Sequence, residues 1–311
     1  MFNVSYFSFT FYILIPFILL MKIVLFKDKS KLTCLMEFCL SSLYYFFLFI
    51  TARWDLYSVY GKYLLIVGIV LIIIITIKDL FNRQPFFPVI KAGWLYNILL
   101  IIFVVFLYLV NIQSVNGLKP IEKNLPDYEL QFPLKNGVYY ISQGGSHSFL
   151  SKYAGDAEVK YKICVTKLNK TGQRALGVYP QICSNYYIFK ENIFSPVTGK
   201  ILKVVDGMRD FNPPEKDEYF ADGNYIVIAF QDYNLKINHL LRGSIQLKLG
   251  EEVQKGQYLA QVGNSGSSTE PQLCMEIYKN TENKNGQKIQ SQPIFFNKKF
   301  SVRNKIIKIY D

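Results

Sequence analysis

The chain has 311 residues, half of them hydrophobic, and a formal net charge of +12 at pH 7. Its mean hydropathy of +0.15 excludes one ordinary water-soluble domain and also a protein that lies wholly in a membrane. The apolar residues crowd into the first 115 positions. We therefore expect a membrane part followed by a water-soluble part of ordinary domain size.

Both parts are basic. Residues 1–117 hold 9 Lys and Arg against 4 Asp and Glu, and residues 118–311 hold 26 against 19. A basic exterior domain favours an anionic envelope or lipid headgroups as a partner, although a lysine excess also serves solubility alone. The sequence contains neither an Arg-rich helix nor an aromatic–basic RNA motif, so a nucleic-acid partner is not expected.

Four apolar stretches are long enough to cross about 30 Å of hydrocarbon as helices. They are residues 7–25, 32–51, 63–77 and 95–110. No Lys or Arg precedes the first stretch, and no small-x-small cleavage site follows it. We therefore interpret it as a span rather than a cleaved signal peptide, and expect a four-helix transmembrane region over residues 1–112.

Lysine and arginine are concentrated in the first and third connections between these stretches. Lys22, Lys27, Lys29 and Lys31 lie in or beside the first connection. The third holds Lys78, Arg83 and Lys91, and the second only Arg53 and Lys62. Because cytoplasmic loops carry the excess of Lys and Arg, we expect both termini outside the membrane. Glu37, in the second stretch, marks a transport pathway, reaches the membrane interface or pairs with a neighbouring helix.

The remainder of the chain alternates apolar and polar residues. A polar, proline-spaced connector is expected over residues 113–135, followed by alternating runs bounded by glycine turns at 200–205, 225–230, 258–262 and 273–278. Period-two alternation places every second side chain on one face of a strand. We therefore expect an all-β domain over residues 136–311.

Six segments carry a specific resemblance. They are Ser195-Pro-Val-Thr-Gly-Lys-Ile201, Asp222-Gly-Asn-Tyr-Ile-Val-Ile228, Ile237-Asn-His-Leu240, Gly243-Ser-Ile245, Leu249-Gly-Glu-Glu-Val-Gln-Lys-Gly-Gln257 and Val262-Gly-Asn-Ser-Gly-Ser-Ser-Thr-Glu-Pro-Gln-Leu-Cys274. In this order and spacing, the chain resembles the M23 (lysostaphin/LytM-like) zinc metallopeptidases over residues 136–297. The resemblance implies a compact antiparallel β fold of the duplicated hybrid or barrel-sandwich type, with a groove. It also implies peptidoglycan peptides as the substrate class.

Active members of that family hold zinc through a His-x-x-x-Asp pair and the second His of a His-x-His. The first His of that His-x-His and another in a His-Leu segment assist the chemistry. A catalytic zinc needs three protein ligands and an open position for water. The water-soluble part contains only two histidines, His147 and His239, which excludes the usual constellation.

The resemblance assigns the degenerate positions residue by residue. Gln272 stands at the assisting His and Cys274 at the second zinc-ligand His, while Cys164 falls on the Asp and Lys160 on the first His. His239 is retained. A lysine cation repels a dication and Gln272 cannot act as a base near neutral pH, so we expect no zinc and no ordinary peptidase activity. Further groove and turn positions are Asn224, Asn264, Ser265, Gly266 and Pro271.

Three interpretations of the cysteines stay open. Two ligands of one zinc lie about 4 Å apart, so their replacements are close enough for a disulfide between Cys164 and Cys274. Alternatively, the cysteines fill a buried place as small apolar residues. In the third interpretation, Cys164, Cys274 and His239 hold an unorthodox zinc. His147, in a loop ahead of the sheet, is expected at the surface unless that loop folds over the groove.

Three functions follow from these residues. The first is an inactive, membrane-anchored peptidase-like protein of the bacterial cytoplasmic membrane, which binds peptidoglycan peptides or a cell-wall hydrolase outside and membrane lipid within. The second is an active zinc endopeptidase with unorthodox ligands. The third is a transport or immunity-type membrane protein with an accessory β domain.

Overall fold

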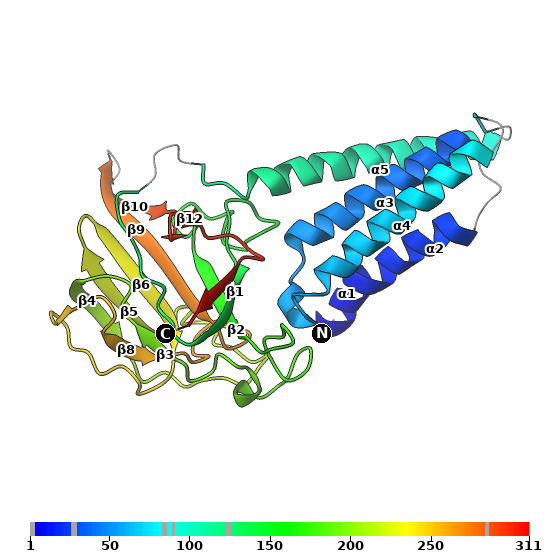
Figure 1. Cartoon of the computed structure of the whole chain (residues 1–311). Coiled ribbons are helices and arrows are strands. Elements are labelled where there is room, and N and C mark those ends of the chain that lie inside the picture. The colour runs from blue at the N-terminus through cyan, green and yellow to red at the C-terminus, as the bar shows by residue number, and fades with distance from the viewer. Residues whose placement is uncertain are drawn as a thin grey trace. The chain divides into compact units, whose positions relative to one another are not determined.

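The computed structural model describes residues 4–25, 30–82, 86–88, 91–121, 126–283 and 286–310. The chain divides into two compact units, each described here by itself. The helical unit comprises Met1–Trp54 and Tyr60–Val115, and the β unit comprises Asp55–Val59 and Asn116–Asp311. Figure 1 shows the helices α1 to α5 and the strands of the β unit.

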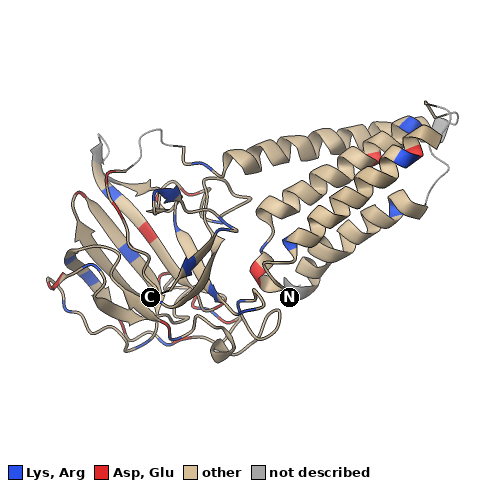
Figure 2. Cartoon of the chain, in the orientation of Figure 1, with Lys and Arg blue, Asp and Glu red and all other residues tan. Residues whose placement is uncertain are grey.

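Four long apolar helical segments make up the helical unit, as the sequence predicts. The elements are α1 (Val4–Phe9), a π-helical turn (Thr10–Leu14), α2 (Ile15–Leu25), α3 (Lys31–Thr51), α4 (Lys62–Asn82) and α5 (Lys91–Asn116), with a short 3₁₀ turn at Trp54–Leu56. The candidate membrane spans are Tyr6–Leu25, Lys31–Thr51, Lys62–Asn82 and Gly93–Asn116. Charged residues of this unit gather mainly toward the helix ends (Figure 2). Lys27, Lys29 and Arg83, on which the expected orientation depends, lie outside the described residues.

A proline explains the π-helical turn. Pro16 has no backbone N–H, and the Phe11 carbonyl, five residues earlier, accepts a hydrogen bond from the Tyr44 hydroxyl on α3 at 2.8 Å. The neighbouring Tyr45 donates to the Pro16 carbonyl at 2.8 Å. A Cβ on Gly68 would lie 2.6 Å from Cε1 of Tyr45, so α4 approaches α3 where it carries no side chain.

A polar cluster ties three helices of this unit together. Glu37 on α3 is buried, and its Oε1 accepts from the Tyr96 hydroxyl on α5 at 2.6 Å. Lys22 on α2 lies 3.3 Å from the same oxygen and donates to Tyr96. Glu37 therefore pairs with neighbouring helices, which is one of the three roles expected for it.

The β unit is built around one antiparallel sheet. Its strands are β1 (Gly137–Gln143), β2 (Ile163–Leu168), β3 (Asn192–Phe194), β4 (Gly199–Val205), β5 (Asn224–Phe230), β6 (Tyr233–Leu240), β7 (Glu252–Val253), β8 (Tyr258–Gln261), β9 (Leu273–Asn283), β10 (Gly286–Gln292), β11 (Phe295–Phe296), β12 (Lys299–Phe300) and β13 (Ile306–Ile309). The sheet order is β13-β1-β2-β9-β6-β5-β4-β7, with β10 paired to β9. Two small ladders, β11–β12 and β3–β8, accompany it.

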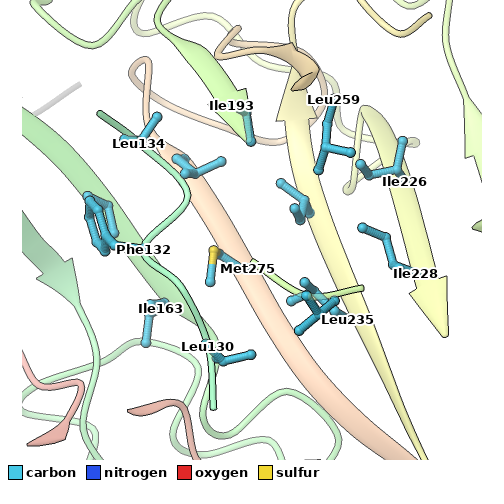
Figure 3. Packing of buried hydrophobic residues seen from close by; sticks show 14 of the residues in the cluster. Leu130, Phe132, Leu134, Ile163, Ile193, Ile226, Ile228, Leu235, Leu259 and Met275 are labelled. Carbon is cyan, nitrogen blue, oxygen red and sulfur yellow. The ribbon is translucent and has the colours of Figure 1, made fainter. Parts of the chain in front are cut away.

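One face of this sheet carries the hydrophobic core. Alternate residues of the central strands point into it, among them Ile163, Ile226, Ile228, Leu235 and Met275 (Figure 3). Because the side-chain period of a strand is two, the residues between them lie on the opposite face. The candidate site is on that opposite face.

The expected connector differs from the structure. α5 continues to Asn116, and four apolar residues of the proline-spaced segment, Tyr128, Leu130, Phe132 and Leu134, belong to the hydrophobic core of the β unit. Leu130 also forms a parallel bridge with Phe296. Burial of these side chains keeps the segment on the sheet, so residues 126–135 are part of the β unit rather than a free linker.

Candidate functional site

Three neighbouring strands present polar residues on the face opposite the core. β2, β9 and β6 are adjacent in the sheet, and their core-facing residues include Ile163, Leu273, Met275 and Ile237. The alternate positions are Cys164 on β2, Cys274 and Glu276 on β9, and Lys236 and Asn238 on β6. We call this set the polar face.

At the centre of the polar face, Cys164 and Cys274 stand directly opposite each other in the β2–β9 register. The structure has a disulfide between them, with an S–S distance of 1.98 Å and Cα atoms 4.1 Å apart. Both side chains are fully buried. The Tyr153 hydroxyl, from the loop before β2, lies 3.8 Å from the Cys164 Sγ. The disulfide joins the two strands where the resemblance places two zinc ligands.

His239 lies at the end of β6 and is fully buried. Its backbone is in the left-handed region, with φ +62°, and its Nδ1 is 2.9 Å from the Ser265 carbonyl. Because a carbonyl oxygen only accepts, Nδ1 carries the hydrogen and Nε2 is left as the acceptor. Burial, and next the nearby Lys162 cation, lower the pKa of His239 to about 3. The imidazole is therefore neutral at physiological pH.

Gln272 is held by the loop that precedes β9. The side chain is buried, and its Nε2 donates to the Ser268 hydroxyl at 3.2 Å. The Ser268 hydroxyl in turn donates to the Glu270 carbonyl at 2.8 Å. An amide neither gains nor loses a proton near neutral pH, so this side chain does not act as an acid or a base.

The structure places Lys160 and Lys162 differently. Lys160 lies in the turn before β2, partly exposed, with its ammonium over the ring of the adjacent Tyr161. Lys162 is buried and lies 3.9 Å from Asp222, with its ammonium over the Tyr153 ring. In an extended segment, side chains two residues apart lie on the same side of the chain, so Lys162 is on the side of Cys164. The lysine that faces the site is Lys162, which sequence reasoning missed.

Lys162 belongs to a network of charges along the polar face. Lys236 donates to Asp222 and lies 3.3 Å from the buried Glu276. Burial lowers the pKa of Lys162. Burial by itself would raise the pKa of Asp222, but Lys236 and Lys162 hold that pKa below its usual range. The network keeps two ammonium groups and two carboxylates beside the disulfide.

Sequence reasoning also missed Asp222, Lys236 and Glu276. The signal that could have found Lys236 and Glu276 is the alternation itself, because Lys236-x-Asn238 and Cys274-x-Glu276 repeat polar residues at a spacing of two inside apolar strands. Asp222 lies in the turn before β5, where this pattern is absent. In the register Lys236 stands opposite Glu276, and Asn238 opposite Cys274.

The expected groove and turn residues form a hydrogen-bonded support behind His239. The Asn224 side chain donates to the Leu240 carbonyl at 3.0 Å, and the Ser265 hydroxyl donates to the same carbonyl at 2.8 Å. The Asn264 amide donates to the Phe211 carbonyl at 2.6 Å. All three side chains are buried, so they position the turn that accepts the His239 hydrogen.

The two remaining turn positions also lie in this region. Gly266 has φ +73°, and a Cβ there would lie 2.3 Å from the Gly223 nitrogen, so only glycine fits this close approach. Pro271 is buried at the entry to β9. His147 lies apart from these residues, in the loop after β1, and its ring contacts Phe149. Its Cβ packs against Gly117, where an added Cβ would lie only 2.6 Å away.

The donor set of the site does not fit a catalytic zinc. Within the described ranges, no group of three or more His, Cys, Asp or Glu side chains is arranged to hold a metal ion. Disulfide sulfurs supply no thiolate, and Lys162 places a cation against His239. We therefore assign no role at this site to a metal ion.

One protein family matches part of the chain. Residues 190–289 match the family described as Peptidase family M23. No curated protein matches the chain.

Among the solved structures that are similar to the chain are three of which the chain covers less than two thirds. A zinc-containing peptidase from Vibrio cholerae is 19% identical, with 52% of this chain and 39% of that chain covered and a TM-score of 0.29. A putative M23 peptidase from Pseudomonas aeruginosa is 17% identical, with 56% and 54% covered and a TM-score of 0.29. The antimicrobial peptidase lysostaphin from Staphylococcus simulans is 20% identical, with 33% and 41% covered and a TM-score of 0.22. The chain thus carries a Peptidase family M23 domain, matched over residues 190–289, behind four long apolar N-terminal helices.

Proposed function

We propose that this chain is a membrane-anchored M23-type protein that binds peptidoglycan peptides without hydrolysing them. The observation that carries the proposal is the buried disulfide between Cys164 and Cys274. Both sulfurs stand where the family resemblance assigns zinc ligands. A thiolate is the form of cysteine that binds a metal, and oxidation to a disulfide removes it.

The proton-transfer groups support the same proposal. Hydrolysis of an amide needs an activated water and a group that takes its proton. Gln272 cannot take a proton near neutral pH, and its amide is anchored to Ser268. His239 is fully buried, and its pKa of about 3 makes the free Nε2 a weak base. The polar face is therefore equipped for binding rather than for catalysis.

The partly exposed edge of the charge network, Lys236 and Asp222, carries groups that recognise peptides. Their ammonium and carboxylate groups donate and accept charge-assisted hydrogen bonds, which are the stronger kind. Peptide amides and the free carboxylates and amines of peptidoglycan stems are matching partners. The candidate spans would hold this face at the bacterial cytoplasmic membrane, in contact with lipid.

The test uses the full chain purified in detergent, with lysostaphin as the active control. We expect no clearing of a peptidoglycan gel, with or without a chelator, and co-sedimentation of the chain with insoluble peptidoglycan. Lys236→Met should weaken co-sedimentation, because Lys236 joins Asp222 to Glu276. Lys279→Met, which removes only an exposed pair with Asp232, should not.

Each contrary result has a definite meaning. Clearing that a chelator abolishes would overturn the proposal in favour of a zinc endopeptidase with unorthodox ligands. Absence of co-sedimentation would refute the peptide ligand and direct attention to a partner hydrolase.

We also propose that both termini lie outside the membrane. An even number of spans places the two ends of the helical region on one side, and the lysine distribution selects the outside. Protease added to intact cells should remove a C-terminal tag. Protection of the tag until the cells are opened would contradict this orientation.

A further inference from the structure

The segment Asp55–Val59, between α3 and α4, belongs to the β unit rather than to the helical unit. The Val59 N–H donates to the Gly172 carbonyl at 2.9 Å, and the Ser58 hydroxyl donates to the Thr171 carbonyl at 2.7 Å. The segment that joins two candidate spans is thus hydrogen-bonded into the loop after β2.

Asp55 is the fully buried centre of this contact. Its backbone carbonyl accepts from the Arg174 N–H at 3.1 Å, and its Oδ2 lies 3.8 Å from the Arg174 Nε. The same Oδ2 accepts from the Thr166 hydroxyl at 3.3 Å. Arg174, also buried, donates from Nε and Nη2 to Glu270 Oε2 at 2.9 and 2.6 Å. Removing one partner of a buried charge pair strongly destabilises the fold, because the other charge is left buried without compensation.

The two ends of this chain of contacts lie beside the two cysteines. Thr166 is on β2, two residues after Cys164 and on the same face. Glu270 is four residues before Cys274, in the loop that also holds Gln272 through Ser268. Asp55 therefore contacts β2, which carries Cys164, directly. Through Arg174 it also contacts the loop before β9, which carries Cys274.

We propose that Asp55–Val59 is a regulatory contact that couples the α3–α4 connection to the site around Cys164–Cys274. A change in that connection alters the positions of β2 and of the segment Glu270–Cys274, which leads into β9. A change at the site, by ligand or by reduction of the disulfide, alters the connection in return, because coupling between two places is reciprocal. The regulatory purpose rests on the proposed function, whereas the coupling itself is measurable without any ligand.

The forward experiment is hydrogen exchange with mass spectrometry on the full chain in detergent. Asp55→Ala should increase exchange by about fivefold or more in peptides that cover 163–168 and 269–276, while peptides of β4 and β5 keep their rates. Asp55→Asn, which keeps the shape, and Thr166→Val, which removes only one hydrogen bond, serve as milder variants that fold. Asp232→Asn, which removes an exposed carboxylate paired with Lys279, is the matched control.

The reverse experiment replaces both cysteines by serine. The reporter amides are those of Val59 and Arg174, because they donate across the contact. Faster exchange at these two amides supports the coupling. Unchanged exchange in both directions, or a uniform increase through β4 and β5, would overturn it. Hydrolytic activity of the chain would instead refute the proposed function and leave this coupling standing.

Discussion

Cys164 on β2 lies directly opposite Cys274 on β9, and their disulfide spans 110 residues of sequence in the buried centre of the polar face. A crosslink of this kind stabilises a fold by about 2–4 kcal/mol, mainly by restricting the unfolded chain. Replacing both cysteines by serine should therefore lower the unfolding temperature of the β unit by about 5–15 °C. Scanning calorimetry of the full chain measures this change.

Cys183 gives the matched control. It is buried outside the disulfide, and its thiol donates to the Phe211 carbonyl at 3.1 Å, a bond that serine can keep. Cys183→Ser should lower the unfolding temperature less than the double replacement does. Peptide mapping without reductant should recover Cys164 joined to Cys274. A Cys164–Cys183 link, or three free thiols, would refute the pairing.

The buried neutral His239 should make the β unit sensitive to acid. Its pKa is about 3 in the folded protein and about 6.5 in the unfolded chain. Between these values only the unfolded chain binds the proton, so the stabilisation is complete above about pH 6.5 and is lost as the pH falls toward 3. The loss is at most about 1.4 kcal/mol per pH unit.

Unfolding temperatures measured from pH 7 to pH 4 test this behaviour. His239→Gln should flatten the dependence, because the titrating group is gone. A dependence as steep in His239→Gln as in the unchanged chain would contradict the assignment.

The two lysines before β2 can be distinguished through His239. The Lys162 cation is the second cause, after burial, of the low pKa of His239. Lys162→Met should therefore raise that pKa, although burial still keeps it below 6.5. Lys160→Met is the matched control, since Lys160 lies over the Tyr161 ring. Titration of the labelled imidazole by NMR decides, and a shift with Lys160→Met alone would reverse the assignment.

In the helical unit, Tyr96→Phe should loosen the polar cluster around Glu37. It removes a 2.6 Å hydrogen bond to a buried carboxylate and leaves the pair with Lys22. The expected cost is about 1–2 kcal/mol. Thermal aggregation in detergent measures it, with the exposed Tyr108→Phe on the same helix as control. Equal aggregation temperatures for the two variants would contradict a stabilising role of the cluster.

The parts of the fold that depend on long, regular patterns could be predicted from the sequence. The structure confirms the four apolar helices, which were predictable because each apolar run continues for many turns. It also confirms the sheet, which was predictable because alternation sets the two faces of each strand. Tyr128 and Leu130 could not be placed in the core. Their segment is interrupted by prolines, and its burial depends on a surface formed much later in the chain, where Leu130 meets Phe296.

The site was less accessible to sequence reasoning. Counting four residues back from Cys164 selects Lys160, but the turn at 157–161 removes that residue from the strand and leaves Lys162 beside Asp222. The partnership of Asp55 with Arg174 joins residues more than a hundred positions apart, and no local pattern in the sequence announces it.

The metal content of the purified full chain tests the central claim most directly. If Cys164 and Cys274 are joined and the polar face binds without hydrolysis, elemental analysis after dialysis should find far less than one zinc ion per chain, unchanged in Cys274→Ser. One zinc ion per chain, lost in Cys274→Ser together with chelator-sensitive hydrolysis, would contradict it.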